Sequence, residues 1–163
     1  MIKPLALNVT FYLGKNEQMD KMRWRYGDTN PVVAAVQADT VIEMGDLLWL
    51  DGRVAKPACE LWGLIVFKNN FLGVAMQRSP KGHTAAIRVA PSGVFEFPCT
   101  AHSVELGNLV TVATENGLKL ANQIVRLTGE KCFAIGRVAK RSDDPVSSVL
   151  VSIVSTIMSG GIQ

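Results

Sequence analysis

The sequence predicts an all-β fold, a small barrel or sandwich whose body consists of two similar halves. The main observation is an internal repeat, because VIEMGDLLWLDGRVAKPA (41–58) returns later in the chain as VELGNLVTVATENGLKLAN (104–122). Two further blocks return in the same order, FLGVA (71–75) as FAIGRVA (133–139) and IRV (87–89) as VLV (149–151). Solenoids need about three repeats, so two copies favour one domain in two halves.

The pattern inside each copy is that of β-strands joined by tight turns. In the first copy, Gly45-Asp46 supplies a turn, the run LLWL (47–50) favours a strand, and Asp51-Gly52 predicts a hairpin. A glycine inside the apolar runs FLGVA and AIGRVA is typical of a bulge or a close backbone approach, rather than of a phosphate loop. The glycines expected to be structural, at turns or bulges, are Gly45, Gly73, Gly93, Gly107 and Gly136.

The chain divides into an extended N-terminal arm (1–40), a body (41–158, with half-copies at about 41–92 and 103–157) and a C-terminal tail (159–163). The arm is polar and rich in turn formers in its middle, and Asn30 precedes Pro31, which biases it toward extended structure. At most one short helix is predicted, over 59–70, where the second copy has only 123–132. The other predicted elements are a loop at 78–84, strands at 86–90 and 94–97, a repeated hairpin over 103–121, a loop at 141–145 and a last strand at 147–157.

The last predicted strand, 147–157, is apolar on both of its faces. Val149, Val151 and Ile153 share one face, and Leu150 and Val154 share the other. A strand that is apolar on both sides is either central to the body or part of a subunit contact. The positive mean hydropathy of the chain also favours an oligomer.

The arm contains Arg23-Trp24-Arg25-Tyr26, a string in which cationic and aromatic side chains alternate. In an extended segment these side chains would form two chemically different faces. The string is either a docking segment, since Trp, Tyr and Arg are enriched in interface hot spots, or an edge strand that packs Trp24 on its own domain.

Composition limits the classes of function. The chain has 163 residues, of which 48% are hydrophobic and 19% charged, enough for one well-filled core. Its net charge of +3 comes from 17 basic and 14 acidic residues spread along the sequence, unlike the clustered charge of a nucleic-acid binder. The start of the chain lacks the pattern of a signal peptide, and its apolar C-terminal run is too short for a bilayer span, so we expect a protein made in the cytoplasm.

The sequence contains little that predicts catalysis. Cys59, Cys99 and Cys132 lie at wide spacings in apolar neighbourhoods and are expected to be unpaired core thiols. With only His83 and His102 available as partners, neither a nucleophile elbow nor a zinc spacing is present. The aspartates, Asp46 among them, sit in turns, and no phosphate-binding glycine motif follows a strand. We therefore expect no enzyme activity, no metal and no cofactor.

From about Arg25 to Gly161 the chain resembles the capsid cement, or head decoration, proteins of tailed bacteriophages. The resemblance rests on RYGDTNPVVAAV (25–36), VIEMGDLLWLD (41–51), FLGVAMQ (71–77), IRVAPSGVFEF (87–97), ELGNLV (105–110), AIGRVAKR (134–141) and VLVSIVSTIMSGG (149–161). The segment 1–22 lies outside it.

The resemblance implies a compact β-barrel or β-tulip body and a structural role in the virion. Members of the family sit on the outer capsid surface, usually as trimers, and an extended arm clamps neighbouring subunits of the major capsid protein. The implied partners are therefore the major capsid protein and further copies of this chain, without nucleic acid or membrane. The residues expected to contact the capsid or a neighbouring subunit are Arg23, Trp24, Arg25, Tyr26, Asp28, Asn30 and Pro31.

Two alternatives remain open from the sequence. One is another virion structural module on the same scaffold, such as a spike base or a tail-associated part. The other is a small nucleic-acid-binding β-barrel that uses Arg23, Arg25 and the loop around Lys81. Salt separates the second from a cement protein, because phosphate binding weakens steeply with salt whereas apolar contacts do not.

Overall fold

A computed structural model describes residues 22–116 and 118–163 of the chain and confirms the all-β prediction. Its strands are β1 Trp24–Tyr26, β2 Val32–Ala34, β3 Leu47–Asp51, β4 Val54–Pro57, β5 Phe71–Ala75, β6 Ile87–Ala90, β7 Ser92–Val104, β8 Leu109–Glu115, β9 Lys119–Leu127, β10 Gly136–Val138 and β11 Ser142–Val154. The helical segments are the 3₁₀ turns η1 Ala58–Glu60 and η2 Lys131–Phe133 and the short α-helices α2 Leu64–Asn69 and α3 Thr156–Ser159.

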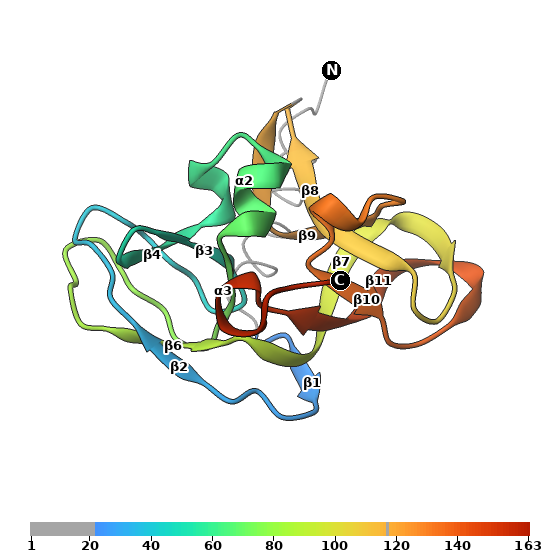
Figure 1. Cartoon of the computed structure of the whole chain (residues 1–163), viewed down its shortest axis with the longest axis horizontal. Helices are drawn as coiled ribbons and strands as arrows, with labels where there is room; N and C mark the ends of the chain where they lie inside the picture. Colours follow the sequence, from blue (N-terminus) through green and yellow to red (C-terminus); the bar gives the residue numbers. More distant parts are fainter. Residues whose placement is uncertain (1–21, 117) are drawn as a thin grey trace, which may run out of the picture.

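The strands form two sheets, each of which curls back on itself. In the first, β2-β6-β5-β3-β4, the outer strands meet at one parallel bridge, where the Ala55 N–H donates to the Ala35 carbonyl at 2.8 Å. In the second, β1-β7-β11-β10-β8-β9, a parallel pairing of β7 with β9 closes five strands into a barrel. We call β2–β6 the first half and β7–β11 the second half; they lie left and right in Figure 1, with α2 and α3 between them.

The two halves share one topology, as the repeat predicted. The order β2-β6-β5-β3-β4 becomes β7-β11-β10-β8-β9 when each strand is replaced by its counterpart. The turn before the hairpin is also repeated bond for bond. The Glu43 N–H donates to Asp46 Oδ2 at 2.9 Å, and the Glu105 N–H donates to Asn108 Oδ1 at 2.9 Å. An aspartate in the first half and an asparagine in the second therefore accept the same backbone hydrogen bond at this turn.

The repeat begins earlier than the sequence indicated, and the halves close separately rather than forming one joint barrel. Val32 of β2 pairs with Val89, just as Phe95 of β7 pairs with Val151. The strands β2 and β7 share an alternation of more and less buried positions but not a sequence, so the sequence repeat does not extend to them. The first strand of the first half thus lies inside the segment expected to be the arm.

The described part of that arm, residues 22–40, is integrated into the body, and residues 1–21 lie outside the described residues. β1 pairs antiparallel with β7, and Arg23 is only 7% exposed. Over residues 22–40 the segment expected to be an extended arm is therefore part of the body. The physical reason is that backbone pairing and the buried contacts of Arg23 fix this segment.

The helical segments differ from the prediction at both places where helices form. The helix expected over 59–70 is reduced to α2, because Leu61 and Gly63 adopt extended backbone. The last strand ends at Val154, since the Ser155 side chain accepts the Met158 N–H at 3.1 Å and starts α3. The predicted loop at 141–145 instead lies largely within the irregular start of β11, and part of the predicted tail is packed, with Ile162 buried.

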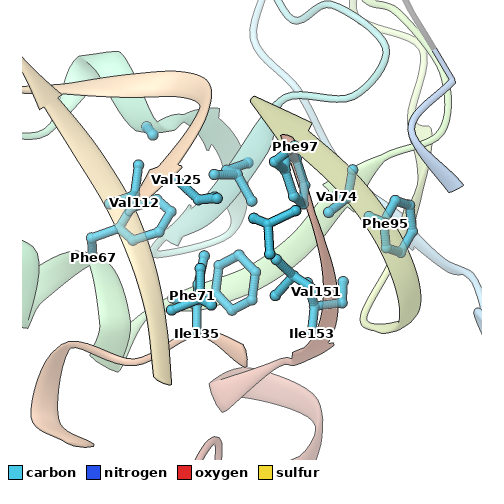
Figure 2. Packing of buried hydrophobic residues seen from close by; sticks show 14 of the residues in the cluster. Phe67, Phe71, Val74, Phe95, Phe97, Val112, Val125, Ile135, Val151 and Ile153 are labelled. Carbon is cyan, nitrogen blue, oxygen red and sulfur yellow. The ribbon is translucent and has the colours of Figure 1, made fainter. Parts of the chain in front are cut away.

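Buried side chains form two clusters, divided by the alternation along the strands. Leu48 of β3 points into the first half, while its neighbours Leu47 and Trp49 belong to the larger cluster shared with the second half. The first-half cluster comprises Ala34, Val36, Ile42, Leu48, Ala55, Leu72, Ala75, Ile87 and Val89. Figure 2 shows the larger cluster, in which Phe67, Phe71 and Val74 of the first half pack with Val112, Val125, Ile135 and Val151 of the second.

The glycines inside the apolar strands lie where the backbone comes close, as predicted. Gly73 has a φ of +154°, and a Cβ built there would lie 2.0 Å from the Ala90 carbonyl oxygen. A Cβ on its counterpart Gly136 would lie 2.5 Å from the Ser152 carbonyl oxygen. No side chain fits at these distances. The predicted glycines Gly45, Gly93 and Gly107 adopt positive φ.

Replacing Gly73 with alanine should lower the free energy of unfolding by about 3 kcal/mol or more, because a backbone carbonyl would have to move. Urea denaturation followed by circular dichroism measures this change. Gly129→Ala is the matched control, since a Cβ there meets nothing within 4 Å, and it should cost less than about 0.5 kcal/mol. Equal losses for the two variants would contradict the close approach at Gly73.

Candidate functional site

The aromatic side chains of β1 are exposed on the surface. Trp24 is 40% and Tyr26 49% exposed, although β1 itself is paired with β7 at Trp24–Phe95 and Tyr26–Val94. The indole N–H of Trp24 donates to the Gly27 carbonyl at 3.0 Å. The polar atom of Trp24 is thus satisfied within the chain, and the surface that remains for a partner is apolar.

Arg25 lies between the two aromatic residues and is held by an ion pair. Its Nη2 lies 2.8 Å from Glu96 Oε2, and its Nη1 donates to the carbonyls of Met22 and Trp24 at 3.1 Å each. Hydrogen bonds from the Ser148 hydroxyl and from Arg25 lower the pKa of Glu96. The guanidinium thus occupies carbonyl groups on the outer edge of β1. An additional strand that paired with this edge would need the same carbonyls as hydrogen-bond acceptors.

An open pocket of about 550 Å³ adjoins this surface. Its lining includes Arg25, Tyr26, Glu96, Lys140 and Arg141. Arg141 also pairs with Glu105 and Asp143, at 3.1 and 2.6 Å, so the charges around the pocket are largely balanced. The exposed aromatic side chains, the Arg25–Glu96 pair and this pocket together form what we call the β1 surface.

The other residues predicted to bind a partner lie in the exposed connection from β1 to β2. The hydroxyl of Ser92 donates to the Asp28 carbonyl at 2.8 Å, and Asn30 Nδ2 lies 3.5 Å from the same hydroxyl. Asn30 has a φ of 41°, and Pro31 follows it into β2. Asp28 and Asn30 therefore help to fix the connection between the two halves, and their exposed atoms border the β1 surface.

Arg23 does not belong to the β1 surface. Its Nε donates to Gln123 Oε1 at 2.8 Å, and Gln123 Nε2 donates to Asp46 Oδ1 at 2.8 Å. One amide of the second half thus joins a cation that precedes β1 to a carboxylate of the first half. The sequence contains one signal for this cluster. The first-half turn has the acid Asp46 where the equivalent turn has the uncharged Asn108, so the turn itself does not require the charge.

Burial dominates the electrostatics of Asp46, which is 2% exposed. Desolvation raises the pKa of its carboxyl to about 6, against hydrogen bonds from the Glu43 N–H and Gln123 that lower it. The nearby charges oppose each other, since Glu43 raises the pKa of Asp46 and Arg23 lowers it. Asp46 therefore titrates at a pH where an exposed aspartate would be fully ionised.

The described residues contain no group of three or more His, Cys, Asp and Glu side chains that could hold a metal ion. Cys59 and Cys99 are half-buried, and burial raises the pKa of both thiols. Cys132 is exposed, so the expectation of three core thiols is corrected at that position. It lies in the 3₁₀ turn η2, where the chain passes over the surface. None of the described helices is long and apolar enough to cross a bilayer.

Two comparisons with known proteins were negative. No protein-family model matches the chain. No curated protein matches it either.

The folded protein should lose about 3 kcal/mol of stability, through Asp46 alone, as the pH rises from well below 3.8 to well above 6. The folded state has the higher pKa, so it binds the proton more tightly, and protonation favours folding. Denaturant unfolding at a series of pH values measures the slope. Asp46→Asn should remove this part of the slope.

The control for this prediction is Asn108→Asp, which places a carboxylate in the equivalent but more exposed turn. It should add little slope between pH 3.8 and 6. Glu96 acts in the opposite direction at lower pH, because its lowered pKa gives stability that is lost as the pH falls below 4.5. An unchanged slope in Asp46→Asn would contradict the assignment to Asp46.

Proposed function

We propose that this chain is a structural virion protein that binds the outer surface of a tailed-bacteriophage capsid and stabilises the lattice of the major capsid protein. The observation that carries the proposal is the exposed pair Trp24 and Tyr26, held on a strand that is paired with the body. The proposal also draws on the sequence resemblance over 25–161. Its partners would be the major capsid protein and further copies of this chain, and its location the virion.

The β1 surface has the features that suit permanent attachment to a protein surface. Aromatic side chains provide large contact areas at low entropic cost, and they dominate many interfaces. Because β1 is already paired with β7, binding would not have to order this segment from a free chain. The ordering cost of about 1–2 kcal/mol per residue, which a flexible arm would incur, is therefore largely avoided.

The Arg25–Glu96 pair, which lines the same pocket as Tyr26, would add more to the specificity of binding than to its affinity. Both side chains are more than one-third exposed, so the ion pair itself adds little stability. Beside a partner they can offer charge-assisted hydrogen bonds around the apolar contact. In a homotrimer, three such surfaces would act together, and effective concentration would convert modest single contacts into lasting attachment.

Tyr26→Ala should weaken binding to undecorated phage heads by roughly tenfold to a hundredfold, and Trp24→Ala should have a similar effect. Both residues are about half exposed, so the melting temperature of the isolated protein should change little for Tyr26→Ala. Val33→Ala is the matched control, because Val33 is exposed on β2, away from the β1 surface. Co-sedimentation of each variant with heads measures binding.

Two outcomes would count against the proposal. The first is unchanged binding of both aromatic variants at a concentration where the wild type is half bound. The second is steep loss of binding between low and moderate salt, which would indicate phosphate recognition instead. Binding by apolar contact should persist as the salt concentration rises.

A further inference from the structure

A second exposed apolar surface lies on the two α-helices, between the two halves. We call it the helical patch; its side chains are 40% to 66% exposed and comprise Trp62, Ile65, Val66, Ile157 and Met158. Ile65 and Val66 lie on the exposed side of α2, Ile157 and Met158 lie on α3, and Trp62 lies in the extended segment just before α2. α3 adjoins the end of α2, since the Thr156 hydroxyl donates to the Lys68 carbonyl.

The barrel repeat does not require the outer face of α2. The second half reaches its equivalent strand, β10, through the shorter turn η2 and has no α-helix there. The inner face of α2 is anchored by Phe67, which is fully buried, with Leu64 packed against the same cluster. The exposed face of α2 therefore carries large apolar side chains that are required neither for packing the core nor for connecting the strands.

The two helices of the helical patch carry little charge, unlike the β1 surface. Lys68 is the only ionisable side chain within α2 and α3, and it is partly buried, with its Nζ near Gly161. When two copies of one surface meet, every charge faces its own sign, so a charged patch repels itself whereas a neutral one does not. The absence of charge on these helices therefore suits a second copy better than a charged partner.

The size of the helical patch also fits self-association. Its five side chains expose on the order of 500 Å², similar to the largest apolar patch of a typical monomer. Two copies facing each other would remove on the order of 1,000 Å² from water, close to the lower limit for a specific interface.

We propose that copies of this chain associate in solution through the helical patch. The inference rests on the proposed function, because it names a surface through which further copies of this chain, one of its proposed partners, associate with it. It leaves the β1 surface free for the capsid. The two surfaces belong to different elements, α2 with α3 and β1 with β7, so their roles can be tested separately.

The test is light scattering of the full chain over a concentration series, without capsids. The wild type should have a mass of at least twice the monomer mass of 17.7 kDa. Ile65→Glu should weaken self-association roughly a hundredfold or more, because a carboxylate would be buried in an apolar contact. Glu is a good helix former and lies favourably near a helix N-terminus, so α2 should persist.

Val33→Glu is the matched control, since it places a glutamate at another exposed apolar position, on β2. It should leave the mass unchanged. Far-UV circular dichroism and melting of each variant show whether it is folded. A monomeric wild type at tens of micromolar would overturn the inference and leave the patch to residues 1–21 or to a capsid protein. An unchanged mass in folded Ile65→Glu would also overturn it.

The failure of this inference is distinguishable from that of the proposed function. A chain that binds heads but stays monomeric in solution overturns the role of the helical patch alone. A chain that forms oligomers through Ile65 but does not bind heads supports the helical patch while overturning the capsid proposal. Tyr26→Ala should leave the mass in solution unchanged, which separates the β1 surface from the helical patch.

Discussion

The contact between the two halves is the interaction on which the rest of the structure depends. Leu47, Trp49, Phe71 and Val74 point outward from the first half and join the aromatic cluster of the second. The interior of the first half is small, because its own cluster consists of alanine, valine, leucine and isoleucine side chains. Packing the halves together adds the aromatic side chains that the interior of the first half lacks.

The two halves share a topology but not an outer face. At equivalent positions of the paired strands, Val74 corresponds to Arg137 and Ala90 to Ser152. Arg137 donates to the Gly107 carbonyl at 3.1 Å, and Ser152 is exposed. The apolar contact face is thus present in the first half and replaced by polar side chains in the second. A further unit of the same topology would not find the equivalent apolar face on the second half. The packing therefore does not continue beyond two units.

The sequence predicted those features that depend on neighbouring residues or on the repeat. The Gly45 and Gly107 turns, the hairpins and the close approaches at Gly73 and Gly136 all follow from local chemistry. The burial of Arg23 could not be predicted, because it depends on Gln123, which is 100 positions away in the chain. The shortened helix could not be predicted either, since Gly63 is tolerated within helices, whereas here its backbone is extended and α2 begins only at Leu64. Trp24 lies on an edge strand, as one of the two sequence interpretations predicted, and 40% of it is exposed, while its role in docking stays a prediction.

The arrangement of one half after the other along the chain has a consequence for biosynthesis. All five strands of the first half are complete at Ala90, before any strand of the second half has left the ribosome. Until the second half is made, Trp49 and Phe71 lack the second-half side chains that pack in the same cluster. While the second half is still being made, the nascent chain therefore exposes apolar side chains that are buried in the finished protein, and exposed surface of this kind favours aggregation.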